Sequence, residues 1–331
     1  MRLQQAWLGR GALAWGLRPL AGFYGSLAAV HRSLYTLGIR HTERLPVPVV
    51  VVGNVVAGGA GKTPVVMAVV QHLQSRGLQP GVISRGYGRT GDTPSLEVRP
   101  DDDPRAAGDE PLLLARRCGV PVVVGARRAQ AGRHLLARHP QVQVLVSDDG
   151  LQHRALARDI EICVFDARGI GNGWLLPAGP LREPWPRRAD LVLRPAGVAG
   201  VEGFEVRRRL APEAVRADGT RRSLADLARG PLTAVAGIAQ PEAFFDMLRG
   251  AGIVPAHTLA LADHHDYALH PVSLPADLPV VCTEKDAVKL WRLRPDAWAV
   301  PLQVEIDPAF WPAFDRLLDA KLSSVDGSQT A

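Results

Sequence analysis

Hydrophobic runs alternate with amphipathic stretches along the first half of the chain, and this alternation predicts an α/β fold. The β-branched run Val49–Val52 is typical of a strand buried on both faces of a parallel sheet. Further apolar runs predict strands at 81–84, 122–124, 142–146 and 160–165. Helical periodicity predicts helices at 64–76, 109–117 and 127–138. Strands that alternate with helices imply βαβ units with right-handed crossovers, and therefore a large parallel sheet.

The second half of the chain is patterned less regularly and predicts a smaller α/β lobe. Residues 167–188 are rich in Gly, Pro and Arg, which is typical of a long functional loop. A short strand is expected at 191–193, and the arginine-rich residues 195–229 are only weakly patterned. The remaining expected elements are strands at 232–238 and 279–282 and helices at 242–249, 284–290 and 310–318. The polar tail after Ser323 is expected to fray.

These patterns predict three parts, with the ligand in a cleft between the last two. Residues 1–40 form an N-terminal helical segment, residues 41–205 a P-loop NTPase-like core, and residues 206–331 a C-terminal α/β lobe. A boundary between the two lobes is expected in the weakly patterned stretch 195–230.

The N-terminal segment carries an apolar stripe at helical spacing. Its members, at steps of three and four residues, are Phe23, Leu27, Val30, Leu34 and Leu37. A spanning helix needs about 20 apolar residues with few interruptions, and Arg18 and Pro19 interrupt this stretch. We therefore expect an amphipathic helix that lies on, or partly in, a membrane. The same pattern also fits a helix packed on the protein's own core.

Composition narrows the classes of partner without choosing one. The 331 residues are 47% hydrophobic and 22% charged, as in globular proteins, and the net charge of +6 favours an anionic partner. Three cysteines lie far apart, which argues against a disulfide framework or a zinc site and fits a reducing cytoplasm. Only four of the 39 basic residues are lysines: Lys62, Lys285, Lys289 and Lys321. Genomic codon bias explains this excess of arginine, although arginine also suits bidentate phosphate binding.

The strongest local motif is a glycine-rich loop between the first strand and the first core helix. Small residues let backbone N–H groups surround phosphates, and the helix N-terminus adds its positive end. The lysine would contact the β- and γ-phosphates and the threonine hydroxyl would bind Mg²⁺. The residues assigned to nucleotide binding are Val56, Ala57, Gly58, Gly59, Ala60, Gly61, Lys62 and Thr63. Val56 stands where the usual motif has glycine, and an incidental glycine-rich turn is the alternative.

A second motif, 147–153, follows the predicted strand 142–146. A carboxylate at the C-terminal end of a strand beside a P-loop is placed to hold Mg²⁺ directly or through water. Thr63, Asp148 and Asp149 are therefore the predicted metal residues. A simple Asp-Gly turn is the alternative.

Other polar clusters are candidates for catalysis or substrate binding. Asp109 begins a predicted helix, where it would act either as a helix cap or as the general base for an acceptor hydroxyl. His264 lies in the dense cluster 263–266, which lacks further ligands at zinc spacing. The weaker candidates for substrate binding are Arg85, Gln152, His153, Arg182 and Glu183. Solvated loop charge is the alternative for the two arginines.

Taken together and in this order, the motifs resemble those of the tetraacyldisaccharide 4'-kinase family, the lipid A kinases of Gram-negative bacteria. The resemblance covers nearly the whole chain, and the block Asp148–His153 is its most specific part. The segments that carry it are 53–54, 58–64, 84–89, 108–111, 148–153, 179–184, 263–264 and 283–286.

The resemblance implies an ATP-dependent and Mg²⁺-dependent kinase at the cytoplasmic face of the inner membrane, held there peripherally or as a monotopic protein. Its acceptor would be the 4'-hydroxyl of an acylated glucosamine disaccharide 1-phosphate. The resemblance also implies that Asp109 is the catalytic base and that His264 assists it. The family commonly has a hydroxyl residue at Val56 and a threonine or serine at Ala60, and the first departure removes a side-chain contact to phosphate.

Three other functions compete with this interpretation. A P-loop GTPase or metal-insertion NTPase usually needs an Asn/Thr-Lys-x-Asp motif, which Thr283–Asp286 only resembles because its lysine and aspartate are adjacent. A nucleotide-gated membrane adaptor would not need carboxylates beside the loop. A nucleic-acid role rests only on the basic pI and lacks an aromatic-interleaved basic motif, so we expect no nucleic-acid partner. The sequence leaves protein partners unknown.

Overall fold

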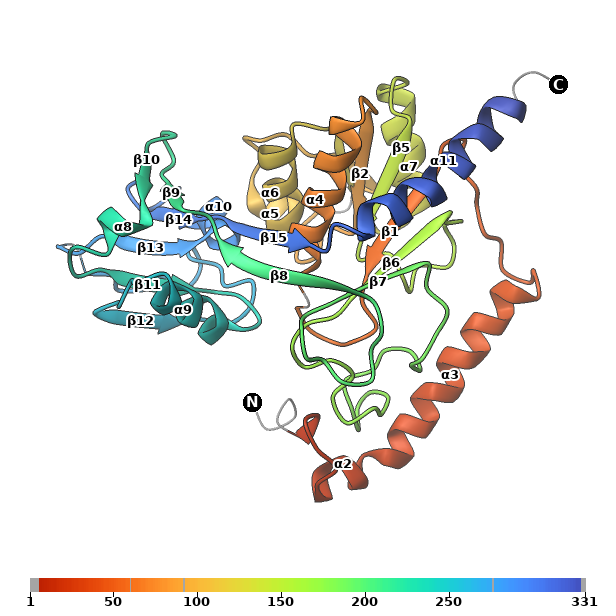
Figure 1. Cartoon of the computed structure of the whole chain (residues 1–331), viewed down its shortest axis with the longest axis horizontal. Coiled ribbons are helices and arrows are strands. Elements are labelled where there is room, and N and C mark those ends of the chain that lie inside the picture. The colour runs from red at the N-terminus through yellow and green to blue at the C-terminus, as the bar shows by residue number, and fades with distance from the viewer. Residues whose placement is uncertain (1–5, 60, 92, 276, 329–331) are drawn as a thin grey trace.

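The computed structural model describes residues 6–59, 61–91, 93–275 and 277–328, and its strands form two sheets (Figure 1). Within these residues the larger sheet has the strand order β15-β8-β7-β6-β1-β5-β2-β4-β3, and the smaller has the order β10-β9-β14-β13-β11-β12. The larger sheet is parallel from β8 through β4 and gains antiparallel strands at its two edges. The predicted α/β fold with a dominant parallel sheet is confirmed.

The larger sheet carries the first candidate motifs at the ends of its central strands. Its strands are β1 (Val49–Gly53), β2 (Pro80–Ser84), β3 (Ser95–Glu97), β4 (Val122–Gly125), β5 (Val144–Asp148), β6 (Ile160–Val164), β7 (Leu191–Arg194), β8 (Phe204–Leu210) and β15 (Leu302–Ile306). The helices beside it are α4 (Lys62–Ser75), α5 (Pro104–Ala107), α6 (Asp109–Cys118), α7 (Arg128–Arg138) and α11 (Phe310–Ser328).

Strand β1 is the centre of this sheet because its valines are buried on both faces. Val50 and Val52 pack into one apolar cluster with α4, α6 and α11, while Val49 and Val51 pack into a second cluster with α7. Successive side chains of a strand point to opposite faces, so an unbroken valine run supplies both cores at once. β1 therefore brings the loop after Gly53 to the edge where β5 also ends.

The smaller sheet forms a second lobe with its own core. Its strands are β9 (Glu213–Val215), β10 (Arg221–Ser223), β11 (Thr233–Ala236), β12 (His257–Ala260), β13 (Val280–Thr283) and β14 (Trp298–Val300). Its helices are α8 (Leu224–Leu227), α9 (Pro241–Gly250) and α10 (Glu284–Leu290). Phe244, Phe245 and Leu248 of α9 fill one side of its core.

The chain passes between the lobes differently from the expected boundary at residue 206. Strand β8 lies in the larger sheet and pairs antiparallel with β15, so residues 302–328 return to the first lobe instead of remaining with the second. In Figure 1 these two long strands run together from one lobe to the other. The sequence hides β8 because Arg208 interrupts the alternation of Phe204, Val206 and Leu210.

Several element bounds also differ from the predictions. Strand β5 spans Val144–Asp148 rather than 142–146, which makes Asp148 itself the last residue of the strand. Helix α11 continues to Ser328, so the tail expected to fray after Ser323 is helical through that point. Strands β3, β9, β10, β12, β14 and β15 were not predicted.

The N-terminal segment forms α2 (Ala12–Gly16) and α3 (Arg18–Thr36), and α3 extends along the outside of the molecule (Figure 1). Ala21 is the one residue of α3 that is buried. Phe23, Leu27 and Val30 of the predicted stripe are each more than half exposed, at 66%, 54% and 59%. The alternative of a helix packed on the protein's own core is therefore wrong for this stripe. Among the described residues, no helix has the length and apolar character needed to cross a membrane.

The same segment is attached to the long loop 167–188 through polar contacts. The Trp7 indole donates a hydrogen bond to the carbonyl of Pro177, and the Tyr24 hydroxyl donates to the carbonyl of Arg182, each at 2.9 Å. Trp15 packs edge-on against Trp174, with ring centroids 5.1 Å apart. The exposed stripe is thus fixed to the loop that carries Arg182.

Candidate functional site

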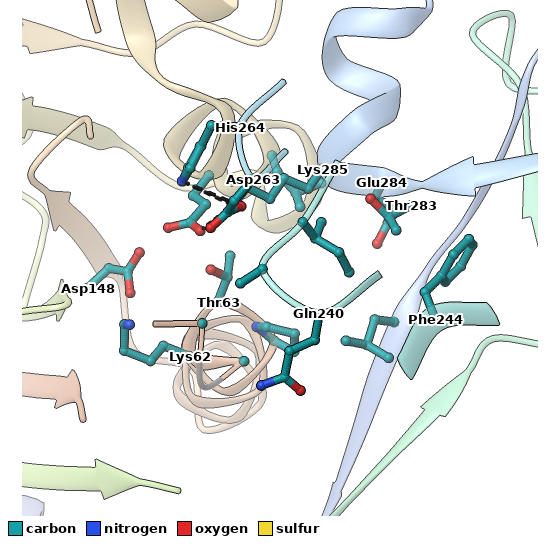
Figure 2. A pocket seen from close by; sticks show the side chains of 18 of the residues that line it. Lys62, Thr63, Asp148, Gln240, Phe244, Asp263, His264, Thr283, Glu284 and Lys285 are labelled. Atoms are coloured by element: carbon teal, nitrogen blue, oxygen red, sulfur yellow. Dashed lines mark hydrogen bonds and ion pairs between the residues drawn. The ribbon is translucent and has the colours of Figure 1, made fainter. Parts of the chain in front are cut away.

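A cavity of about 840 Å³ lies where the two lobes meet, and most of the predicted site residues surround it. Its first wall consists of the P-loop, the ends of β2 and β5, and the start of α6. Its second wall comes from the start of α9, the loop at 263–264 and the start of α10. Figure 2 shows Lys62, Thr63 and Asp148 together on one side, with Phe244 and Glu284 on the other.

The P-loop has the strand–loop–helix geometry that phosphate binding requires. Gly61 adopts a left-handed conformation, with φ +65°, and serves as the N-cap of α4. A residue with a Cβ would be strained there, and that atom would lie 2.7 Å from the Arg208 guanidinium. The Lys62 ammonium lies 3.5 Å from the amide oxygen of Asn54 and 3.4 Å from Asp149. Gly58, Gly59 and Thr63 also line the cavity.

Two of the residues assigned to nucleotide binding do not line the cavity. Val56 is only 1% exposed and packs in the apolar cluster beneath the loop, where its carbonyl accepts a hydrogen bond from Asn54. Ala57 donates its N–H to the carbonyl of Pro180 at 2.7 Å. An apolar residue at 56 therefore serves the core below the loop. Ala60 lies outside the described residues.

Asp148, one of the predicted metal residues, is buried at the end of β5. Its side chain is 1% exposed, and neither carboxylate oxygen has a hydrogen-bond partner among the described residues. Burial, together with the nearby Glu110 carboxylate, raises the pKa of Asp148 to about 7, although Lys62 opposes the shift. A cation beside this carboxylate would satisfy both oxygens.

Asp149 occupies a different environment although it is adjacent in sequence. Its backbone is left-handed, with φ +50°, which turns its carboxylate toward Lys62 and Arg182, each 3.4 Å away. Burial alone would raise the pKa of Asp149, but Lys62 and Arg182 hold it below its usual range.

The donor set fits Mg²⁺ bound with a nucleotide rather than a metal held by the protein alone. No group of three or more His, Cys, Asp or Glu side chains in the described ranges is arranged to hold a metal ion. Asp148 and Thr63 both line the cavity on the side of the P-loop (Figure 2). Mg²⁺ normally takes one or two protein ligands and completes its shell with phosphate oxygens and water.

Asp109 and His264 are brought together from different lobes, as expected. The His264 Nδ1 lies 3.2 Å from the Asp109 Oδ2, and the Lys289 ammonium lies 2.7 Å from the same oxygen. Burial would raise the pKa of Asp109, but these two donors hold it below its usual range. The alternative of a helix cap is wrong, because Gly108 is the N-cap of α6 and no side chain caps it.

His264 joins the large cavity to a smaller one that contains Asp109. The smaller cavity, of about 190 Å³, is lined by Asp109 and Lys289, and His264 lines both cavities. The Lys285 ammonium lies 3.2 Å from His264 Nε2. An ammonium only donates, so Nε2 accepts and the ring proton sits on Nδ1, which donates to Asp109. Asp109 itself does not line the larger cavity.

The five weaker candidates for substrate binding separate into two groups. Arg85 and Arg182 line the large cavity. Gln152 and Glu183 instead form a network below the loop, where the Gln152 amide donates to the Glu183 carboxylate at 3.0 Å. His153 accepts a hydrogen bond from the backbone N–H of Arg128, and burial lowers its pKa to about 4. These three residues do not line the large cavity.

The second wall ends in an apolar region contributed by both lobes. Phe244 and Met247 of α9 face Leu210 and Leu302 across this end of the cavity. Asp286 cannot read a guanine base here, because its buried carboxylate accepts hydrogen bonds from Gly237, Tyr267 and Thr283. The resemblance of Thr283–Asp286 to a guanine motif therefore has no counterpart in the cavity.

Sequence reasoning assigned no role to several residues that the structure places in the site. Lys285, Gln240 and Arg208 line the large cavity, and Lys289 contacts Asp109. The scarcity of lysine was the sequence signal that could have identified Lys285 and Lys289. Three of the four lysines lie at this junction: Lys62 in the P-loop, and Lys285 and Lys289 one helical turn apart on α10.

Known proteins similar to this chain in sequence and in structure belong to one family. A sequence model of the tetraacyldisaccharide-1-P 4'-kinase family matches residues 13–322. The tetraacyldisaccharide 4'-kinase of Acidovorax sp. (strain JS42) is 57% identical, over 99% of this chain and 96% of its own length. That of Polaromonas naphthalenivorans (strain CJ2) is 55% identical, over 98% and 97%.

The crystal structure of LpxK from Aquifex aeolicus in complex with ATP superimposes with a TM-score of 0.80 at 28% identity, covering 92% of this chain and 99% of that one. The family match extends over almost the whole chain, and the relatives match it over nearly their full lengths. This chain therefore belongs to the tetraacyldisaccharide-1-P 4'-kinase family.

Proposed function

We propose that the protein transfers the γ-phosphate of ATP to the 4'-hydroxyl of tetraacyldisaccharide 1-phosphate, a step of lipid A biosynthesis. The observation that carries this proposal is the cavity at the junction of the lobes. The P-loop and the buried Asp148 carboxylate line it from one lobe, and His264 lines it from the other. Family membership supports the reaction and its acceptor. The ATP in the related Aquifex aeolicus structure supports the donor.

In this proposal the P-loop side of the cavity holds the triphosphate. The backbone N–H groups after Gly58 and the N-terminus of α4 surround the phosphates, and Lys62 neutralises the β- and γ-phosphates. The adenine lies at the apolar end against Phe244 and Met247, which line the cavity from α9. In this arrangement one nucleotide would contact both α9 and the P-loop.

Thr63 and Asp148 are the residues that would hold Mg²⁺, with Asp149 adjacent. The support is the burial of Asp148 beside the P-loop with no hydrogen-bond partner in the described part of the chain. When bound, Mg²⁺ would supply positive charge that offsets the negative charge developing on the phosphates during transfer. Asp149 already contacts Lys62 and Arg182, so its role is to position those two cations.

Asp109 is the proposed base for the acceptor hydroxyl. It is ionised because Lys289 and His264 stabilise its carboxylate, and both contacts fall on Oδ2. Oδ1 is then the atom that accepts the hydroxyl proton. His264 orients the carboxylate and borders the cavity where the γ-phosphate would lie.

Arg85 and Arg182 are proposed to bind the acceptor, since both line the cavity. A guanidinium binds phosphate and sugar oxygens with paired, directional hydrogen bonds. Gln152, His153 and Glu183 would act indirectly, by holding the loop that carries Arg182.

A phosphate-transfer assay tests the reaction and its metal requirement. With Mg²⁺ and ATP, we expect product from the lipid disaccharide 1-phosphate and negligible phosphate release to water, because the base is placed for an ordered acceptor. Removing Mg²⁺ with EDTA should abolish transfer, and Asp148→Asn should raise the Mg²⁺ concentration needed for half the maximal rate. ATP hydrolysis that proceeds equally without the lipid would contradict the kinase assignment. An Asp148→Asn variant with unchanged Mg²⁺ dependence would contradict the metal assignment.

An acylated acceptor resides in a membrane, so the proposed substrate also indicates where the protein acts. We propose that α3 lies on the cytoplasmic face of the inner membrane, where ATP is available, and holds the enzyme there peripherally or as a monotopic protein. The support is the exposed stripe of α3 and its attachment to the loop of Arg182. A lipid entering from the membrane would then meet the cavity beside this loop.

Substituting the stripe should release the protein from membranes. Full burial of one such side chain contributes about 1.5–3 kcal/mol, so changing Phe23, Leu27 and Val30 together to serine should weaken binding to phosphatidylethanolamine–phosphatidylglycerol vesicles at least about 100-fold. Cosedimentation with the vesicles measures this. Deleting all residues before His41 would also remove the contacts of Trp7 and Tyr24, so point substitution is the cleaner test.

A matched control uses equally exposed apolar residues of the second lobe. Val254, Leu269 and Leu293 are 78%, 65% and 52% exposed. Changing these three to serine should leave vesicle binding intact. Equal binding by both triple variants would show that α3 is not the principal contact with the membrane.

A further inference from the structure

Lys289 is the second residue from the opposite lobe, besides His264, that contacts the proposed base Asp109. It lies on α10 of the second lobe, one turn after Lys285, and its side chain is 11% exposed. In a chain with only four lysines among 39 basic residues, a buried lysine at this place is unusual. A codon bias toward arginine favours arginine at a basic position, so the lysine at 289 indicates that a compact ammonium is needed there.

The contact geometry favours a role in setting the state of the carboxylate. Lys289 Nζ lies 2.7 Å from Asp109 Oδ2, which is shorter than the 3.2 Å from His264 Nδ1 to the same oxygen. Lys285 contacts the other ring nitrogen of His264, Nε2, at 3.2 Å and does not contact Asp109. Lys289 is therefore the fixed positive charge in contact with Asp109 within the described part of the chain.

The other groups around this pair do not substitute for the ammonium. From the 263–267 loop, His264 faces Asp109, and Tyr267 places its ring 6.0 Å from Lys289. From α10, Asp286 lies near Lys289, but its carboxylate is occupied by Gly237, Thr283 and Tyr267. From α6, Glu110 pairs with Lys285 at 3.1 Å.

We propose that Lys289 is a positioning residue for phosphoryl transfer. It keeps the Asp109 carboxylate ionised and orients it, so that Oδ1 is presented to the acceptor hydroxyl only while α10 packs against α6. This inference rests on the proposed role of Asp109 as the base. It makes the second lobe a contributor to proton transfer through two residues, His264 and Lys289.

A purely structural ion pair across the lobes is the competing explanation. The same junction contains such a pair, because Arg292 lies 2.9 Å from Asp103 with both side chains about half exposed. Arg292 also lines the small cavity, but it does not contact Asp109. It provides a control that removes a bond between the lobes without touching the base.

The test is the pH dependence of kcat/KM for the full-length Lys289→Met enzyme with the lipid acceptor. A carboxylate base is active when ionised, and an opposite charge at this distance lowers its pKa by about 1–3 units. Loss of Lys289 should therefore move the acid limb to higher pH by at least about one unit. Below both pKa values, a shift of one unit lowers kcat/KM about 10-fold, and this deficit should disappear by pH 8.5, where the carboxylate is ionised in both enzymes.

Two further variants separate charge from structure. Lys289→Arg keeps the positive charge, so its acid limb should stay near that of the wild type even if kcat falls. Arg292→Met should keep both the acid limb and kcat/KM. An unchanged acid limb in Lys289→Met, or an equal shift in Arg292→Met, would overturn the proposal. If Lys289→Met does not fold, Lys289→Gln replaces it with the same expectation.

A double variant distinguishes failure of this inference from failure of the proposed base. With Asp109→Asn the carboxylate is gone, so adding Lys289→Met should reduce kcat/KM far less than it does in the wild type. An active Asp109→Asn enzyme would refute the base itself. An inactive Asp109→Asn enzyme combined with an unshifted Lys289→Met profile would refute only the role of Lys289.

Discussion

Lys62→Ala is expected to abolish measurable turnover. The Lys62 ammonium is the lysine of the P-loop, and it lies between Asn54 and Asp149 at the floor of the cavity. Losing one group that stabilises transition-state charge typically costs about 10²–10³-fold in kcat, and here ATP binding should weaken as well. Phosphate transfer to the lipid disaccharide and calorimetric titration with ATP would measure the two effects.

A lysine away from the site provides the matched control for this prediction. Lys321 lies on α11 and does not line the large cavity. Lys321→Ala should therefore retain normal kcat. A Lys62→Ala enzyme that is folded and turns over at the wild-type rate would remove the P-loop assignment altogether.

Asp109→Ala is expected to lower kcat strongly while ATP binding survives. A positioned general base contributes typically about 10²–10⁴-fold, and Asp109 is held by His264 and Lys289 away from the P-loop itself. Removing it also leaves the Lys289 ammonium buried without its counter-charge, which costs about 3–5 kcal/mol of stability. Asp109→Asn keeps a hydrogen-bond acceptor and separates the chemical effect from this destabilisation. The quantities to measure are kcat, nucleotide Kd and melting temperature for both variants.

His264→Ala provides the second half of this test. If Asp109 and His264 act as one unit, the loss in the double variant should be far smaller than the product of the single losses. Independent, multiplicative losses would show that the 3.2 Å contact is structural only. A folded Asp109→Asn enzyme with near-normal kcat would show that another group accepts the proton.

Local pattern was sufficient for the parts of the fold that are encoded in consecutive residues. The valine run of β1 predicts a strand buried on both faces, and the glycines and Lys62 that follow predict a phosphate loop at the start of a helix. The apolar stripe of α3 predicts an amphipathic helix. These signals are readable because the physical constraint and the residues that meet it lie within one or two turns of chain.

Long-range pairing hid other elements from the sequence. Strand β8 is recognisable only beside β15, which is separated from it by the whole second lobe and covers one of its edges. Val56 looked like a defective phosphate-binding position, and its side chain is buried beneath the loop because Asn54 and Leu181 fix the backbone there. Gln152 and Glu183 looked like substrate residues, yet they bond to each other.

Short motifs were enough to identify the phosphate loop, the two carboxylates at the end of β5 and the class of reaction. The fold determines that the Asp148 carboxylate is buried with no hydrogen-bond partner among the described residues, while Asp149 contacts two cations, because the left-handed backbone at Asp149 turns the two carboxylates apart. It also decided that Asp109 meets His264 and Lys289. These residues are 155 and 180 positions from it in the chain, and the packing of α10 against α6 places all three within hydrogen-bond distance.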